Sequence, residues 1–223
     1  RLECDAAELE LERWSVRRGD EVFPLQPMLN AYFGSVGTEF VGYGMMKIPY
    51  DARAPLASKN LFWIPSWAGA EVEVDQDTGC VRVLKLVVGA DSGRSVNPTA
   101  CRGQVEGAAI QAYSQAMFEE LTYEGGGPAN AVPQLYRVAA ARDLPEVLES
   151  FVQEQGRGPG PNGLKGIGES GMLAVASAIA NAIEDAVGVR VSQIPFTPER
   201  VLAAIDSKRA QAFTMRDASP VAR

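Results

Sequence analysis

Residues 165–171 have the sequence Lys165-Gly166-Ile167-Gly168-Glu169-Ser170-Gly171, and a helical pattern rich in small residues follows them over residues 172–187. Glycine has no Cβ, so the backbone of this stretch can approach a ligand closely. A helix that begins after Ser170 directs its free N–H groups and the positive end of its dipole toward the same place. The stretch therefore predicts a single carboxylate, that of Glu169, beside backbone that favours an anion.

Two interpretations of Glu169 are open from the residues alone. Acidic residues are favoured in the first turn of a helix, so Glu169 could simply accept N–H bonds where its own helix begins. The glycines on both sides of it, and the loop rich in glycine and proline over residues 156–163, favour instead a catalytic base beside an anionic cofactor.

A second polar residue lies on a helix predicted over residues 98–119. Asn97 is a suitable N-cap for this helix, and its small residues, Gly103 and Gly107 among them, predict that something packs very close to one side. Gln104 shares that side at helical spacing. An amide in this position either makes a helix–helix hydrogen bond or contacts a ligand, and both interpretations stay open.

Strand and helix patterns alternate along the rest of the chain. Residues 70–88 predict a β-hairpin, because apolar and acidic residues alternate, a turn follows at residues 77–79, and an apolar strand returns. Further elements are predicted by their apolar patterns and end signals: a strand followed by a loop over residues 135–152, the helix over 172–187 with Gly188 after it, a short strand over 189–195 and a last helix over 197–205. Together they predict an α+β fold of mixed sheets with packed helices.

The chain is expected to fall into three segments. Residues 1–36 form an N-terminal segment that continues a sheet begun in a missing part or in a partner chain, residues 37–207 form the main domain, and residues 208–223 form a tail. Residue 1 is arginine, which favours a processed subunit, a split subunit or a fragment, so half of any site is expected to lie elsewhere.

The composition narrows the function classes. A net charge of −7 over 223 residues argues against nucleic acid and anionic membrane as partners, and no apolar run approaches the length of a membrane span. The absence of histidine excludes Ser-His and Cys-His catalysis and argues against most zinc sites. Cys4, Cys80 and Cys101 are far apart, which predicts buried free thiols in a reducing compartment. We therefore expect a cytoplasmic location, or a periplasmic one if an export signal precedes residue 1.

Seven short pieces follow one another in a specific order. They are Glu73-Val74-Asp75 with Asp77-Thr78-Gly79; Asp91-Ser92-Gly93-Arg94 with Asn97-Pro98; Gly103-Gln104-Val105-Glu106-Gly107 with Gln111 and Glu119-Glu120; Asp143-Leu144-Pro145; Lys165-Gly166-Ile167-Gly168-Glu169; Ala178-Ile179-Ala180-Asn181-Ala182; and Pro195-Phe196-Thr197-Pro198-Glu199-Arg200-Val201. This order resembles the C-terminal part of the molybdenum-cofactor-binding subunit of the xanthine oxidase family, the molybdenum hydroxylases, over roughly residues 37–205.

The resemblance implies both a fold and a cofactor. The domain would be the second half of the molybdenum-cofactor-binding domain of the xanthine oxidase type. The cofactor would be a molybdenum pyranopterin (Mo-MPT or Mo-MCD), and no side chain is expected to ligate the metal. Glu169 matches the family's general base in the oxidation of a substrate C–H with water as the oxygen source. Gln104 and the backbone of Gly166, Ile167 and Gly168 match cofactor-binding positions.

The resemblance also implies that this chain works only with other parts. Its partners would be the remaining molybdopterin-binding part, an iron–sulfur subunit or domain with [2Fe-2S] clusters and, in many members, a flavin subunit or domain with FAD. The substrate would be a small aldehyde or N-heteroaromatic compound. The alternative is a non-catalytic scaffold or interaction subunit that keeps the fold without the chemistry. Glu169 and Gln104 are both present, which favours the enzyme.

Overall fold

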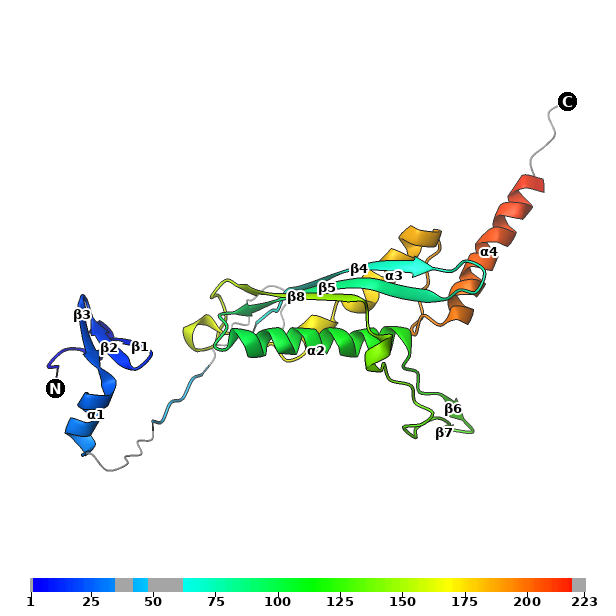
Figure 1. The fold of residues 1–223 in the computed structure, drawn as a ribbon. Helices are drawn as coiled ribbons and strands as arrows, with labels where there is room; N and C mark the ends of the chain where they lie inside the picture. The colour runs from blue at the N-terminus through cyan, green and yellow to red at the C-terminus, as the bar shows by residue number, and fades with distance from the viewer. Residues whose placement is uncertain (1, 35–41, 48–61, 218–223) are drawn as a thin grey trace. The chain divides into compact units, whose positions relative to one another are not determined.

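The computed structural model describes residues 2–34, 42–47 and 62–217, and the chain forms two compact units, residues 1–45 and 46–223. The smaller unit is an antiparallel three-stranded sheet in the order β1-β2-β3 followed by a helix (Figure 1). Its elements are η1 (Ala6–Glu8), β1 (Glu10–Glu12), β2 (Ser15–Arg18), β3 (Glu21–Pro24) and α1 (Leu25–Phe33). Gly19 turns the chain between β2 and β3 with a φ of 56°, a value that glycine adopts without strain.

The larger unit is built on a second three-stranded sheet in the order β4-β5-β8. Strand β4 (Ser66–Val74) is antiparallel to β5 (Val81–Gly93), which confirms the predicted hairpin, and β8 (Val147–Glu154) is parallel to β5. Two parallel neighbours need a crossover connection, and α2 (Pro98–Met117) supplies it. The predicted start of this helix is confirmed, because the Asn97 side chain accepts a hydrogen bond from the backbone N–H of Ala100 at 3.0 Å.

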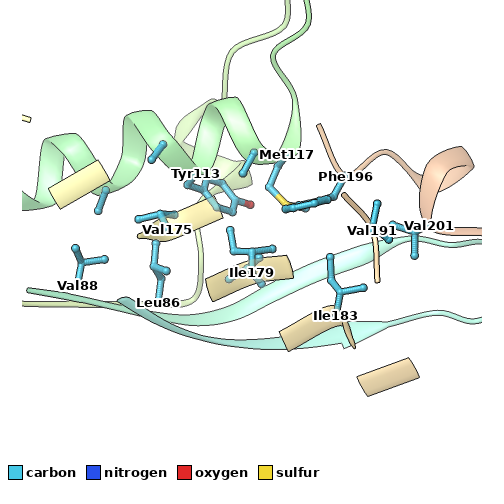
Figure 2. Close-up of a cluster of buried hydrophobic side chains, with 14 of the residues drawn as sticks. Leu86, Val88, Tyr113, Met117, Val175, Ile179, Ile183, Val191, Phe196 and Val201 are labelled. Atoms are coloured by element: carbon cyan, nitrogen blue, oxygen red, sulfur yellow. The ribbon is translucent and has the colours of Figure 1, made fainter. Parts of the chain in front are cut away.

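One face of this sheet carries the hydrophobic core. Helices α2 and α3 (Val175–Val187) pack against it, and the apolar side chains from the sheet point toward those of the helices (Figure 2). The sequence predicts an apolar stripe of Val175, Ile179, Ile183 and Ala186 on α3. The first three are fully buried as predicted, whereas Ala186 is exposed near the end of the helix. Gly188 ends α3 in the left-handed conformation, as the sequence predicts.

The opposite face of the sheet carries an aromatic pair. The ring centroids of Trp67 and Phe151 lie 5.3 Å apart. Both rings flank Gly89, where an added Cβ would lie 2.5 Å from an atom of each ring. A glycine is therefore needed on β5 for the two rings to meet above it.

The remaining elements differ in part from expectation. The order predicted for residues 135–152, a strand followed by a loop, is reversed: an irregular segment with a 3₁₀ turn comes first, and β8 begins only at Val147. The strand predicted over residues 189–195 was wrong. Val189 and Val191 are buried as the pattern requires, but this segment packs against the core without joining the sheet. The other elements of the larger unit are β6 (Tyr123–Glu124), β7 (Gly127–Pro128), η3 (Ala141–Asp143), η4 (Pro161–Gly163), η5 (Ser170–Met172) and α4 (Pro198–Asp217).

Candidate functional site

The segment 165–171 is fixed at its first residue to the end of strand β5. The backbone N–H of Lys165 donates to the carbonyl oxygen of Ser92 at 2.8 Å. The Nζ atom of Lys165 lies 2.7 Å from Oδ2 of Asp91, and these two side chains are only 9% and 7% exposed. The other carboxylate oxygen of Asp91 accepts the backbone N–H of Gly93 at 2.7 Å. A buried ion pair with further hydrogen bonds therefore holds the segment at this end.

The electrostatics of Asp91 fit this role. Burial alone would raise the pKa of the Asp91 carboxyl. The hydrogen bond from Lys165, the N–H of Gly93 and the charge of Lys165 together outweigh burial, and they hold this pKa below its ordinary value. Asp91 is therefore an anion at neutral pH, as a partner of the lysine ammonium must be.

The segment is fixed again at its last residue, against helix α2. Gly171 is buried, and a Cβ added to it would lie 2.6 Å from the carbonyl oxygen of Val105. Ser170 is 5% exposed, and its hydroxyl donates to the carbonyl oxygen of Ile167 at 3.4 Å. The backbone of α2 and the η5 turn thus touch directly, which only a glycine at position 171 permits.

Glu169 lies between these two anchors with its side chain exposed. It precedes η5, and its side chain accepts no capping hydrogen bond there. In the part of the chain that the structure describes, its carboxylate takes part in no hydrogen bond or ion pair. The interpretation of Glu169 as a helix cap is therefore not supported, and none of the described residues occupies its carboxylate.

The helix predicted to begin directly after Ser170 begins later. Residues 170–172 form the 3₁₀ turn η5, in which the N–H of Met172 donates to the carbonyl oxygen of Glu169, and α3 starts only at Val175. The tight turn presses Gly171 onto Val105, so a regular α-helical turn does not form there. The prediction of a long helix that starts directly after Ser170 was therefore wrong, and the first turn of α3 lies farther along the chain from Glu169 than expected.

Helix α2 presents an open face of small residues. Gln104 is exposed there, and a Cβ added to Gly103 or Gly107 would meet no described atom within 4 Å. The close neighbour predicted for this face is thus not found among the described residues. The helix itself is held from its other side, where Glu106 accepts a hydrogen bond from the hydroxyl of Ser150 on β8 at 2.7 Å. The hydrogen bond from Ser150 has the largest effect on the pKa of the Glu106 carboxyl and lowers it, and a second hydrogen bond from Arg102 lowers it further.

The structure brings the predicted residues to neighbouring segments. Gln104 directly precedes Val105, the residue that Gly171 touches, so the α2 face and the segment 166–169 meet at this contact. Gly166 and Gly168 are exposed, whereas the side chain of Ile167 packs against the core and leaves only its backbone to offer a ligand. Sequence reasoning missed the Asp91–Lys165 pair. Both residues belong to quoted motifs, but a single sequence does not show that the two motifs touch.

These residues suit a large anionic cofactor. A Cβ at Gly168 would meet no described atom within 4 Å, and one at Gly166 would meet only the ring of Phe62 at 3.7 Å. Glycine backbone is therefore accessible both on α2 and in the segment 166–168, on either side of the contact between α2 and η5. The amide of Gln104 can donate and accept hydrogen bonds there, as the polar atoms of a pterin require.

One family model matches the part of the chain that contains helix α2, but not the segment 165–171. The model of the molybdopterin cofactor-binding domain matches residues 1–145. The chain belongs to this family. The match includes residues 1–36, in which the sequence shows no family motif, as well as Gln104 in helix α2. The predicted membership in the xanthine oxidase family and the predicted α+β fold are thereby confirmed.

Curated relatives agree with this molybdopterin-binding assignment. The chain is 39% identical over 137 residues to the 6-hydroxypseudooxynicotine dehydrogenase complex subunit gamma of Paenarthrobacter nicotinovorans, which covers 60% of this chain and 17% of that protein. It is 36% identical over 180 residues to the probable hypoxanthine oxidase XdhD of Escherichia coli K12, which covers 79% of this chain and 18% of that protein. The chain thus spans less than a fifth of the length of either relative.

Solved structures share the fold of this molybdopterin-binding chain. Quinoline 2-oxidoreductase from Pseudomonas putida 86 matches with a TM-score of 0.67 at 24% identity, over 92% of this chain and 26% of that one. Aldehyde oxidoreductase from Desulfovibrio gigas matches with a TM-score of 0.55 at 32% identity, over 61% of this chain and 15% of that one. Within the described residues, none of the helices is long and apolar enough to cross a membrane.

Proposed function

We propose that this chain is the C-terminal half of the cofactor-binding region of a molybdenum hydroxylase, with Glu169 as the general base. The observation that carries the proposal is an exposed carboxylate that has no partner among the described residues, on a segment that is fixed at both ends beside an open glycine face. A bound molybdenum pyranopterin would supply the two-electron redox centre for oxidation of a substrate C–H with water as the oxygen source.

The residues of this chain would do three things at that site. The backbone of Gly166, Ile167 and Gly168 would lie against the cofactor, and the amide of Gln104 would bind its polar atoms. The Glu169 carboxylate would remove the proton from the attacking oxygen, for which it must come within hydrogen-bond reach. The buried anchors at Lys165 and Gly171 would keep that reach constant.

The substrate class and the partners are part of the same proposal. The names of the relatives and structures above include dehydrogenases and oxidoreductases of N-heteroaromatic compounds and of aldehydes, and we propose a small substrate of one of these classes. The remaining molybdopterin-binding part would complete the cavity. An iron–sulfur subunit or domain, and in some assemblies a flavin one, would carry the electrons away. The location would be the cytoplasm, or the periplasm if an export signal precedes residue 1.

The substitution Glu169→Gln in the assembled enzyme tests the base. Glutamine keeps the shape but does not accept the proton, so turnover should fall by about 10² to 10⁴-fold while molybdenum and pterin content stay unchanged. Glu71→Gln, which changes an exposed glutamate on strand β4, is the matched control and should keep normal turnover. Near-normal turnover of the Glu169→Gln enzyme would refute the assignment. An assembled complex without molybdenum and pterin would favour the non-catalytic scaffold instead.

A further inference from the structure

The Asp91–Lys165 pair differs from the other ion pairs of the described residues in its burial. Both of its side chains are less than a tenth exposed, whereas in each of the others at least one side chain is more than a third exposed. The pair Lys85–Glu149 offers the closest comparison. It has a similar separation of 2.8 Å and also involves β5, but its side chains are 38% and 57% exposed. Burial makes the geometry of the Asp91–Lys165 pair far more restrictive.

The buried pair also lies within a network of backbone hydrogen bonds. The Asp91 carboxylate accepts a hydrogen bond from the backbone N–H of Gly93, and the carbonyl oxygen of Gly93 accepts one from the N–H of Gly156. The backbone N–H of Lys165 donates to the carbonyl oxygen of Ser92. An added Cβ at Gly93 would lie 2.2 Å from the carbonyl oxygen of Gly163. The backbone at the end of β5 is therefore in contact with the backbone of the loop that leads to Lys165. The Asp91–Lys165 ion pair joins the same two segments through their side chains.

Only residues 166–170 separate this anchor from the second one at Gly171. Ile167 packs its side chain against the core between the two, which leaves Gly166, Gly168 and Glu169 facing outward. A span this short, with both ends fixed, transmits a shift of either anchor to the Glu169 carboxylate. Lys165 cannot itself serve a substrate, because its Nζ atom is buried against Asp91.

We propose that Asp91 and Lys165 are positioning residues that hold the Glu169 carboxylate at its working distance through the backbone of residues 165–168. This inference rests on the proposed role of Glu169 as general base. Misplacement of a catalytic group by about 1 Å costs about 10²-fold in rate, so a loosened anchor should lower kcat although both side chains of the pair are buried.

The test is Lys165→Met in the assembled enzyme, with Lys85→Met as the matched control. Lys165→Met should speed amide hydrogen exchange in residues 166–169, lower kcat by about 10- to 100-fold, and leave KM and molybdenum content near normal. Lys165→Arg keeps the cation and should recover most of the kcat. Lys85→Met should change neither exchange in residues 166–169 nor kcat, because that pair is exposed and far less restrictive.

A second variant guards against a failure to fold, since Lys165→Met leaves the Asp91 charge buried without a partner. Asp91→Asn combined with Lys165→Met removes both charges and is expected to assemble. Wild-type exchange in either assembled variant would overturn the proposal, and so would faster exchange with wild-type kcat. The proposed function fails separately: if Glu169→Gln keeps turnover, the base is misassigned whatever the exchange shows. If Glu169→Gln is inactive and the loosened variants keep wild-type kcat, only the positioning role is refuted.

Discussion

The glycines of the larger unit fall into two groups that the sequence does not distinguish. An added Cβ at Gly89, Gly93 or Gly171 would come within 2.6 Å of another atom, so each of these glycines is explained by contacts within this chain. At Gly103, Gly107 and Gly168, an added Cβ would meet no described atom within 4 Å. The first group explains how this chain packs, and the second has no explanation within the described residues.

The cost of the open glycines makes the contrast informative. A glycine in a helix interior is less favourable than alanine by about 1 kcal/mol, so Gly103 and Gly107 weaken α2 without any gain in packing that the described residues reveal. A cofactor that lies against α2 and the segment 166–169 would supply the missing reason. Substitutions in the two groups should therefore separate stability from cofactor binding.

Gly171→Ala should have the largest effect on folding. The methyl group would meet the carbonyl oxygen of Val105 at 2.6 Å, and backbone cannot move aside as a flexible side chain can. Overpacking of this kind costs about 1–3 kcal/mol. Chemical denaturation of the cofactor-free complex measures the loss, with Gly168→Ala on the same segment as control. Equal stability of the two variants would remove the distinction between closed and open glycines here.

Gly168→Ala should leave the free energy of unfolding of the cofactor-free complex within about 0.5 kcal/mol of wild type. Its methyl group would occupy the space that the backbone offers to the cofactor. We expect molybdenum and pterin content at limiting cofactor to fall, with a loss of affinity of about 10- to 100-fold, as is common for changes next to a metal centre. Metal analysis and pterin fluorescence measure this. Full cofactor content would show that the open space at Gly168 has no role in binding.

Gly107→Ala should have the smallest effect. It should raise the stability of the cofactor-free complex and lower the cofactor content of the assembled enzyme. Alanine is the better helix former, so the cofactor-free complex should gain about 0.5–1 kcal/mol in stability. Cofactor content should fall, because the α2 face becomes less open. Thermal unfolding and metal analysis on the same preparation provide both values. A variant that gains stability and keeps its cofactor would show that this face is open for another reason.

Local patterns predicted much of the fold. Asn97 and Pro98 mark the start of α2, Gly188 marks the end of α3, and alternation predicts the β4–β5 hairpin, because each signal depends on neighbours in the sequence. The strand expected over residues 189–195 failed because buried alternation also arises where a segment packs against a core without pairing. The start of α3 was misplaced because the contact between Gly171 and Val105, which imposes the 3₁₀ turn, is not local.

The residues of the candidate site could be predicted from the sequence, but the buried ion pair that anchors them could not. Motifs and resemblance pointed to Glu169, Gln104 and the glycines, and the structure brings these segments together at the contact between Gly171 and Val105. The role of each residue stays a prediction. The Asp91–Lys165 pair was not predictable, because its partners are 74 positions apart and their pairing depends on how β5 and the 156–164 loop meet.

That separation in sequence also sets an order of events during synthesis. A ribosome makes β5 and α2 long before Lys165, and pairing over long distances in the chain forms slowly. Until Lys165 reaches Asp91 and Gly171 reaches Val105, the segment that carries Glu169 has no fixed position. Both anchors can therefore form only after residue 171 has been made, and a cofactor held by this segment as proposed would bind after that point.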